Sequence, residues 1–225
     1  MSSSVLATVA EIRARLAAVR DRVDAVRAPD QNVVVVGVTK TFPPELVSRA
    51  AAAGLQHIGE NYAQELLAKA NHLAGAEPDL AVDVKWHFIG GLQRNKIKMV
   101  GDAVYLWQTV DRPSLITELA KRCPGARIMI QVNTTDEPQK SGCEPGEAPA
   151  LVEAGLERDL DVVGLMTIGP TGGQDPRPAF DLLRGLAADL GLPQLSMGMS
   201  GDYEVAVEHG STMIRVGSAL FGSRR

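Results

Sequence analysis

The sequence predicts an α/β protein that forms a single (β/α)8 TIM barrel with an extra helix at its N-terminus. Apolar runs of strand length alternate with helix-like segments along the chain, which is typical of parallel strands joined by helical crossovers. Eight such units fit into about 200 residues, at the short end of the size range of these barrels. An open doubly wound sheet is the alternative, but residues 37–41 lack the glycine fingerprint that would follow its first strand.

The composition is ordinary for a globular protein, with 45% hydrophobic and 22% charged residues among 225. A net charge of -4 gives no indication of nucleic acid or of an acidic membrane surface as a partner. The two cysteines lack the spacing of a disulfide framework or of metal ligands, which favours a reducing, cytoplasmic location. No apolar run approaches the roughly 20 residues that a membrane span needs.

Residues 1–27 are predicted to form the extra helix, packed on the body of the barrel. Apolar side chains recur there at steps of three and four, and Ser3 or Ser4 is suited to cap the helix. A targeting peptide is the alternative for this alanine- and arginine-rich segment, but such peptides avoid acidic residues. The acidic residues here are Glu11, Asp21 and Asp24.

The first strand, residues 33–40, is a run of valines that ends on Lys40. Valine is stiff at its first side-chain torsion and fits a pleated surface, and a continuous apolar run predicts a strand buried on both faces. The further strands are predicted at residues 57–60, 84–89, 103–110, 126–132, 162–168, 195–199 and 212–216.

Prolines and glycines delimit the helices between these strands. Pro43 and Pro44 suit the first turn of a helix and Gly54 its end. The other helices are predicted at about residues 62–72, 95–99, 113–122, 147–156, 178–191 and 202–208. No linker marks a boundary, so residues 1–225 are predicted to form one domain.

Three polar residues are predicted to converge where strands end. In such a barrel the C-terminal ends of the strands meet at one face, and closure makes the eighth, first and second strands neighbours. Lys40, Asn61 and Arg215 belong to these strands. A solvated lysine and a surface ion pair of the arginine are the alternatives. The apolar neighbours Ile214 and Val216 favour a buried Arg215.

A phosphate site is predicted after the last two strands. Ser200 is followed by a glycine after the seventh strand, and Gly217 and Ser218 follow the eighth. Barrels often bind phosphate with these loops, and small residues let backbone N–H groups approach an anion. Ser200 could instead cap the next helix, and Gly217 could form a tight turn.

A lysine that faces a phosphate site suggests pyridoxal 5'-phosphate (PLP), which carries an aldehyde and a phosphate on one ring. A lysine amine condenses with this aldehyde to a Schiff base. Burial of Lys40, or the charge of Arg215 nearby, would favour the neutral nucleophilic amine. An arginine at the pyridine nitrogen donates a hydrogen bond and disfavours protonation of the ring.

Short motifs across residues 33–222 strengthen this interpretation. They are VTKT at 38–41, HIGENY at 57–62, WHFIG at 86–90, LQ at 92–93, NK at 95–96, GLMTIG at 164–169, LSMGMS at 195–200, GST at 210–212, RVGS at 215–218 and FG at 221–222. In these motifs the chain closely resembles the pyridoxal-phosphate homeostasis proteins, a PLP-binding family related to the N-terminal domain of bacterial alanine racemase.

The resemblance implies roles for individual residues. It implies that Lys40 forms the Schiff base, that Asn61 lies against the cofactor and that Arg215 faces the pyridine nitrogen. It also implies that Ser200, Gly217 and Ser218 hold the phosphate, with Met199 among the cofactor-binding residues. No metal-binding residues are expected.

The resemblance implies a non-catalytic function. The family binds, stores or hands over PLP, keeps the pools of vitamin B6 and amino acids in balance, and has no established turnover. Apo forms of PLP-dependent enzymes are the expected recipients. Related racemases carry a second, mostly β domain, and this chain ends at Arg225. We therefore expect a monomer whose cofactor is open to solvent.

Two other functions remain open. A weak PLP-dependent amino-acid racemase needs a second acid/base at the opposite face of the ring, and Tyr62 is the tyrosine nearest to a predicted strand end. A phosphate-binding barrel enzyme of sugar metabolism would use Lys40 without PLP and would be colourless.

The chain departs from the family pattern at two positions. Phe42 replaces a second lysine two residues after Lys40, and Gly91 replaces a histidine. Lys140 could serve as an alternative amine, but a solvated loop lysine is the prediction. His87, within an apolar strand, is predicted to be a hydrogen-bonded core residue.

Overall fold

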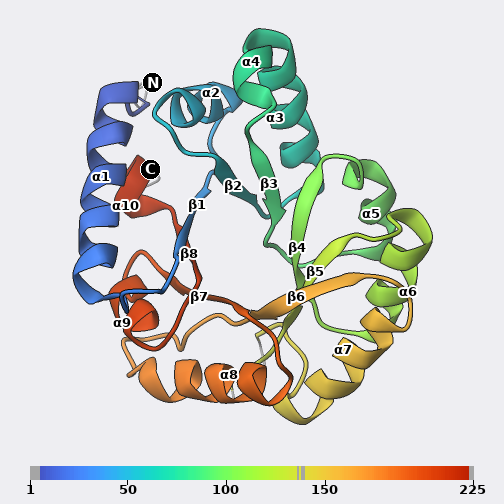
Figure 1. The fold of residues 1–225 in the computed structure, drawn as a ribbon. Coiled ribbons are helices and arrows are strands. Elements are labelled where there is room, and N and C mark those ends of the chain that lie inside the picture. Colours follow the sequence, from blue (N-terminus) through green and yellow to red (C-terminus); the bar gives the residue numbers. More distant parts are fainter. Residues whose placement is uncertain (1–5, 136, 138–139, 223–225) are drawn as a thin grey trace.

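The computed structural model describes residues 6–135, 137 and 140–222 and shows a closed barrel of eight parallel strands (Figure 1). Each strand pairs with the next in the sequence, and β8 pairs with β1 to close the sheet. The predicted fold class is confirmed. The strands are β1 Val34–Val38, β2 His57–Glu60, β3 Lys85–Phe88, β4 Val104–Val110, β5 Arg127–Gln131, β6 Asp161–Met166, β7 Gln194–Met199 and β8 Met213–Val216.

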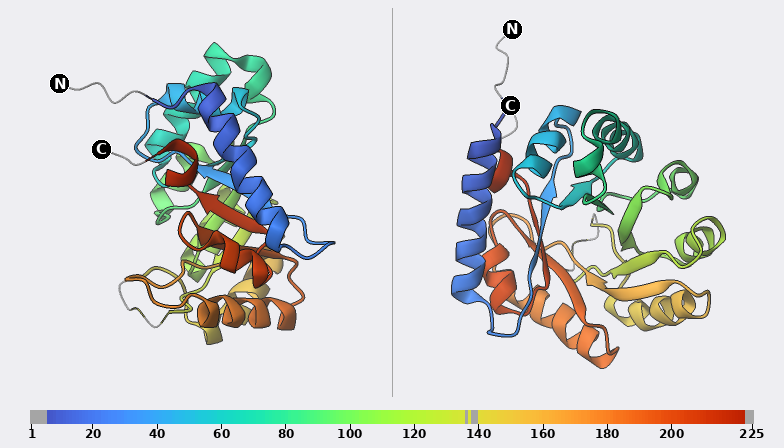
Figure 2. Two further views of the ribbon diagram at one scale, coloured as in Figure 1. Left: turned by 90° about the vertical axis from the view of Figure 1, so that its left-hand side faces the viewer. Right: turned by 45° about the horizontal axis from the view of Figure 1, so that its top comes forward.

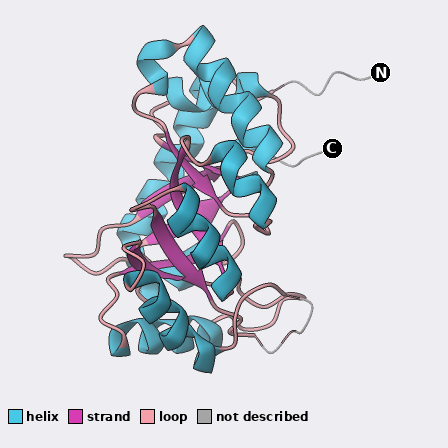
Figure 3. Ribbon diagram, turned by 90° about the vertical axis from the view of Figure 1, so that its right-hand side faces the viewer, coloured by secondary structure: helices cyan, strands magenta, loops and turns pink. Residues whose placement is uncertain are grey.

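Helices surround the barrel, so that its strands form the inner layer of the molecule (Figure 3). The described helices are α1 Val9–Val26, α2 Pro44–Ala52, α3 Ala63–Ala76, α4 Pro78–Ala81, α5 Arg94–Val100, α6 Pro113–Arg122, α7 Ala148–Leu156, α8 Arg177–Asp189, α9 Tyr203–Glu208 and α10 Ser218–Phe221. Helices α4 and α10 and a 3-10 turn at Pro145–Glu147 were not predicted, because elements this short carry no hydrophobic period.

Helix α1 lies along the outside of the barrel against α2, α9 and α10 (Figure 2). Its buried face consists of Ile12, Leu16, Val19 and Val23. The helix begins at Val9, where Thr8 accepts a hydrogen bond from the backbone of Glu11 and the Glu11 carboxylate accepts one from Thr8 N. The predicted caps Ser3 and Ser4 lie outside the described residues, and the helix starts later than predicted because this reciprocal cap forms at Thr8.

Side chains alternate between the two faces of each strand, as the pleat requires. On β1, Val36 belongs to the inner cluster of the barrel, while Val35 packs in the outer layer between the sheet and the helices. The inner cluster consists of Val36, Leu106, Met129, Val163, Met166 and Met213. This small aliphatic cluster leaves room for polar side chains on the inner face at both ends of the barrel.

In the part of the chain that the structure describes, no helix combines the length and the apolar character that a membrane span requires.

Candidate functional site

The predicted site residues lie on adjacent strands. Lys40 and Asn61 follow β1 and β2, Met199 ends β7, and Arg215 lies on β8. The closed sheet places these strands side by side in the order β7, β8, β1 and β2. Their C-terminal ends therefore meet at one mouth of the barrel, as predicted, and this mouth is the candidate site.

Lys40 does not end the strand, contrary to the prediction. β1 ends at Val38, and Lys40 is half-buried in the turn that follows. Continued alternation from the inward-facing Val36 places Lys40 on the inner side and Thr39 on the outer side. The chain leaves the sheet in this turn, where Thr41 adopts a left-handed backbone conformation with a φ of 67°.

A buried ion-pair cluster outside the sheet holds this turn. The ammonium of Lys69 lies 2.6 Å from Glu60 Oε1 and 2.9 Å from Glu65 Oε2. It also donates a hydrogen bond to the carbonyl oxygen of Thr39 over 2.8 Å. Glu65 accepts the backbone N–H of Thr41 over 2.8 Å. Thus both neighbours of Lys40 are hydrogen-bonded to this cluster, which was not predicted from the sequence.

The charges of this cluster depend on its burial. Lys69 is 2% exposed and Glu60 is fully buried. Burial raises the pKa of Glu60, although the charge and hydrogen bond of Lys69 oppose this shift. Burial also acts to raise the pKa of Glu65, but the hydrogen bonds from Lys69 and Thr41 outweigh it and lower that pKa. The spacing of Glu65 and Lys69 by four residues on one helix was the signal available in the sequence.

Arg215 is a buried cation that points into the barrel, as its apolar neighbours predicted. It is 5% exposed, and its two terminal nitrogens donate to Ser196 Oγ and to the carbonyl oxygen of Thr167, each over 2.7 Å. Burial lowers the pKa of Arg215 to about 10, although the charge of Asp202 opposes the shift. The guanidinium therefore stays charged at neutral pH while both of these acceptors are neutral. A buried cation of this kind favours an electron-rich ligand.

Ser200 bridges the loops after β7 and β8. Its hydroxyl oxygen accepts the backbone N–H of Gly217 over 3.2 Å and that of Ala219 over 3.5 Å. The alternative prediction that Ser200 caps the next helix is wrong, because the N-cap residue of α9 is Asp202. Ser218 is exposed at the start of α10. The structure therefore brings the three predicted phosphate ligands together and turns backbone N–H groups toward a single oxygen.

Asn61 supplies an unused polar group. Its side-chain oxygen is buried and has no hydrogen-bond partner among the described residues. Burying an amide oxygen without a partner is unfavourable, so this atom is suited to a ligand. Gly90 packs so closely behind Asn61 that an added Cβ would lie 2.2 Å from its carbonyl oxygen. The amine, the buried cation, this oxygen and the N–H groups together fit PLP.

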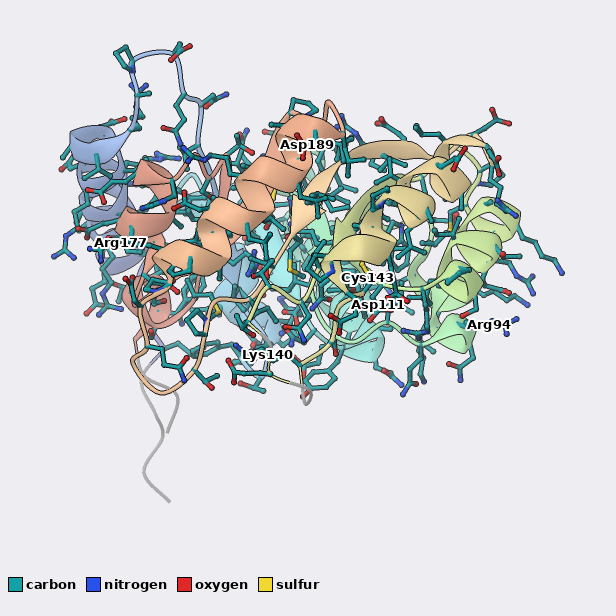
Figure 4. All side chains as sticks on the ribbon, turned by 90° about the horizontal axis from the view of Figure 1, so that it is seen from below. Arg94, Asp111, Lys140, Cys143, Arg177 and Asp189 are labelled. Atoms are coloured by element: carbon teal, nitrogen blue, oxygen red, sulfur yellow. The ribbon has the colours of Figure 1, made fainter. Side chains whose placement is uncertain are left out.

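Phe42, which replaces the second lysine of the family pattern, and the alternative amine Lys140 both make specific contacts. Phe42 packs edge-on against Phe221 of α10, with ring centroids 5.8 Å apart. Lys140 is not the solvated lysine that we predicted, because its ammonium donates to Glu137 and to the carbonyl oxygen of Gly169, each over 2.6 Å. In the view of Figure 4, Lys140 lies at the lower side of the molecule and Asp189, the last residue of α8, at the upper side.

The reactivity of Tyr62, His87 and the buried cysteine Cys143 follows from their surroundings. Tyr62 is 54% exposed at the start of α3. Burial raises the pKa of the Cys143 thiol to about 12, so it carries no thiolate at neutral pH. His87 is fully buried and hydrogen-bonded, as predicted.

Comparisons with known proteins show the family to which the chain belongs. The family described as "Alanine racemase, N-terminal domain" matches residues 11–225. The chain is 40% identical to the pyridoxal phosphate homeostasis protein of Pseudomonas aeruginosa over 229 residues, which cover 97% of each chain. It is 39% identical to the human protein of that name over 211 residues, covering 84% of this chain and 76% of the other.

A solved structure supports the same relationship. PipY of Synechococcus elongatus with PLP bound is 31% identical and superposes with a TM-score of 0.80, covering 94% of this chain and 100% of PipY.

Proposed function

The chain belongs to the pyridoxal phosphate homeostasis proteins of the alanine racemase N-terminal domain family, and from this premise we propose that it binds PLP at the C-terminal mouth of its barrel. We further propose that it serves intracellular vitamin B6 and amino-acid homeostasis rather than a reaction of its own. The names of the relatives refer to homeostasis, and PipY was solved with PLP bound.

The arrangement of three chemical groups on neighbouring strands carries this proposal. Lys40 lies in the turn after β1, Arg215 lies on β8, and Ser200 and Gly217 follow β7 and β8. An amine, a buried cation and converging backbone N–H groups match the aldehyde, the pyridine nitrogen and the phosphate of PLP. When bound, PLP supplies an electrophilic aldehyde on a ring that can accept electrons.

Each group has one task in the proposed complex. The Lys40 amine would join the aldehyde carbon as a Schiff base, with loss of one water molecule. Arg215 would donate a hydrogen bond to the pyridine nitrogen and keep it unprotonated, because a proton there would face a fixed positive charge. Ser200, Gly217 and Ser218 would bind the phosphate, Asn61 would contact the ring, and Met199 would border the cofactor.

A non-catalytic role is proposed because a racemase would need a second acid/base at the opposite face of the ring. Tyr62, the tyrosine nearest to a strand end, is largely exposed at the start of a helix. Transfer of PLP to apo enzymes, a cytoplasmic location and a monomeric state remain predictions. Exchange of the α-hydrogen of alanine with solvent, lost in Lys40→Ala, would instead identify a racemase.

One experiment tests the cofactor and the lysine together. The purified protein is mixed with PLP, and its absorption spectrum is recorded before and after borohydride, followed by peptide mass mapping. We expect a yellow band that disappears on reduction and a pyridoxyl mass on the peptide with Lys40. Lys40→Ala should lose the band, while Lys140→Ala should keep it. A colourless wild-type protein without an adduct would contradict the proposal and favour a sugar-phosphate enzyme.

A further inference from the structure

A chain of hydrogen bonds runs through the inside of the barrel from one end to the other. It begins at Arg215, which donates to Ser196 Oγ over 2.7 Å. Ser196 lies 2.6 Å from Gln108 Oε1, and Gln108 Nε2 lies 2.8 Å from His87 Nδ1. His87 Nε2 lies 2.8 Å from His57 Nδ1. These hydrogen bonds thus connect β8, β7, β4, β3 and β2, and they run alongside the apolar inner cluster, to which Met213 belongs.

The chemistry of Arg215 sets the direction of these hydrogen bonds. A guanidinium only donates, so the hydroxyl of Ser196 accepts from it and gives its own proton to Gln108. The amide nitrogen of Gln108 then donates to His87 Nδ1. The sulfur of Met213, an acceptor, lies 3.0 Å from the same nitrogen and supports this orientation of the amide.

The direction continues through both histidines. If His87 accepts at Nδ1, its neutral ring carries the proton on Nε2 and donates it to His57 Nδ1. Burial lowers the pKa of His87 well below its usual value, and the nearby His57 and Lys85 add to the shift, so the ring stays neutral. His57 lies at the N-terminal mouth, where it lines a cavity of about 340 Å³ together with Tyr105 and Arg127.

Three buried side chains, those of Ser196, Gln108 and His87, thereby support a single orientation of Arg215. The members of the chain other than His57 are at least 95% buried, since Arg215 is 5% exposed and Ser196, Gln108 and His87 are fully buried. The hydroxyl proton of Ser196 cannot point at the guanidinium, and Gln108 Oε1 takes it. Without Gln108 this proton would lack an acceptor in a buried place, which is unfavourable. Without Ser196 the guanidinium would keep only its bond to the Thr167 carbonyl.

We propose that Ser196 and Gln108 are positioning residues for the cofactor, which aim the guanidinium of Arg215 at the pyridine nitrogen through this hydrogen-bond chain. The inference rests on the proposed function and adds to it a set of residues on β4 and β7 that do not touch the cofactor. These hydrogen bonds act on the electronic state of the cofactor ring through Arg215, and they leave the covalent link at Lys40 unaffected.

The test uses two variants and two matched controls. Ser196→Ala and Gln108→Met each remove one link of the chain. Ser211→Ala removes another fully buried serine, whose hydroxyl donates to backbone carbonyls. Gln131→Met removes another buried glutamine, which donates to the carbonyl oxygen of Ser141. All four proteins are loaded with PLP that carries ¹⁵N in the ring, and the NMR shift of this nitrogen and the PLP affinity are measured.

We expect Ser196→Ala to weaken PLP binding about tenfold and Gln108→Met about threefold. In both variants the ring nitrogen signal should move toward that of a pyridine without a hydrogen bond, while borohydride still traps the cofactor on Lys40. The two controls should match the wild type. If both variants give the wild-type signal and affinity, the inference is wrong. If wild-type protein traps no PLP, the proposed function itself fails.

A second measurement on the unmutated protein does not depend on the folding of variants. The ¹⁵N shifts of the histidine rings report which nitrogen carries the proton. The hydrogen-bond chain requires His87 to be neutral with its proton on Nε2 at pH 7. A protonated His87, or a neutral ring with its proton on Nδ1, would reverse the direction of the chain and overturn the inference.

Discussion

Lys69 Nζ donates a hydrogen bond to the carbonyl oxygen of Thr39 over 2.8 Å, so a helix outside the barrel holds the residue that precedes Lys40. The same ammonium contacts Glu60 and Glu65, and Glu65 accepts the N–H of Thr41. The turn that carries Lys40 is thereby tied on both sides to β2 and α3. The amine is presented by a loop, but the loop is anchored in the buried layer between the sheet and the helices.

Lys69→Met should lower the free energy of unfolding by about 3–5 kcal/mol, because it leaves the carboxylate of Glu60 buried without its cation. Urea denaturation measures the change. Arg22→Ala is the control, since Arg22 and Glu204 form an exposed pair at 3.4 Å whose loss should change the stability far less. The double variant Glu60→Gln with Lys69→Met should recover part of the loss. Equal effects of Lys69→Met and Arg22→Ala would contradict the importance of the cluster.

Thr41→Gly should relieve backbone strain, because a β-branched residue is disfavoured at a φ of 67°. The matched control is Asp159→Gly, at a φ of 56°, since aspartate tolerates this conformation better. Glycine adds freedom to the unfolded chain in both variants. We therefore expect the change in unfolding free energy to be more favourable for Thr41→Gly by about 1 kcal/mol. Identical changes in thermal or urea denaturation would show that Thr41 is unstrained.

Ser200→Ala should weaken the retention of PLP by about 1 kcal/mol or more, the scale of a lost charge-assisted hydrogen bond. Dialysis of the loaded protein measures the retention. Pyridoxal, which lacks the phosphate, is the control ligand, and its binding should not respond to the substitution. Unchanged retention of PLP would show that Ser200 only bridges the backbone of Gly217 and Ala219.

Arg215→Glu should shift the absorption of bound PLP, because a carboxylate at the pyridine nitrogen favours the protonated ring whereas a guanidinium disfavours it. Arg127→Gln serves as the control. Arg127 lines the cavity at the opposite mouth of the barrel, so its replacement should leave the spectrum unchanged. An identical spectrum for Arg215→Glu and the wild type would argue against contact between Arg215 and the ring.

The stability of the protein should decrease as the pH falls from about 6.5 to about 4. Burial, with the charge of Lys85, lowers the pKa of His57 from 6.5 to about 4. Between pH 6.5 and about 4, His57 is therefore protonated in the unfolded chain but stays neutral in the folded protein. The stabilisation that is present above pH 6.5 is lost as the pH falls through this range. The groups that face His57 are His87 and Lys85 of β3, Tyr105 of β4 and, across the cavity, Arg127.

His57→Phe should flatten this part of the pH profile of unfolding free energy, as measured by urea denaturation at several pH values. The expected difference from the wild type is confined to the window between the two pKa values. A variant whose profile has the wild-type slope there would show that His57 titrates normally in the folded protein.

Short-range patterns were sufficient to predict most elements. The valine run of β1, the prolines at helix starts and the alternation of strands with helices are local properties, and local properties decide secondary structure when they agree along the chain. These patterns failed to predict α4 and α10, because a helix of four residues is too short to show a hydrophobic period. The solvated position predicted for Lys140 was wrong because its ammonium donates to the carbonyl oxygen of Gly169. Lys140 follows β5 whereas Gly169 follows β6, so no local pattern connects them.

Periodicity and the topology of parallel strands were enough to predict the barrel, the neighbouring strands to which Lys40 and Arg215 belong, and the small residues after β7 and β8. The contacts of Lys69 with the turn before Lys40, of Ser200 with Gly217, and of Gln108 with Ser196 and His87 became visible only in the folded structure. These contacts join residues on different strands and helices. They depend on the register of the closed sheet and on which face each side chain takes, neither of which a local pattern contains.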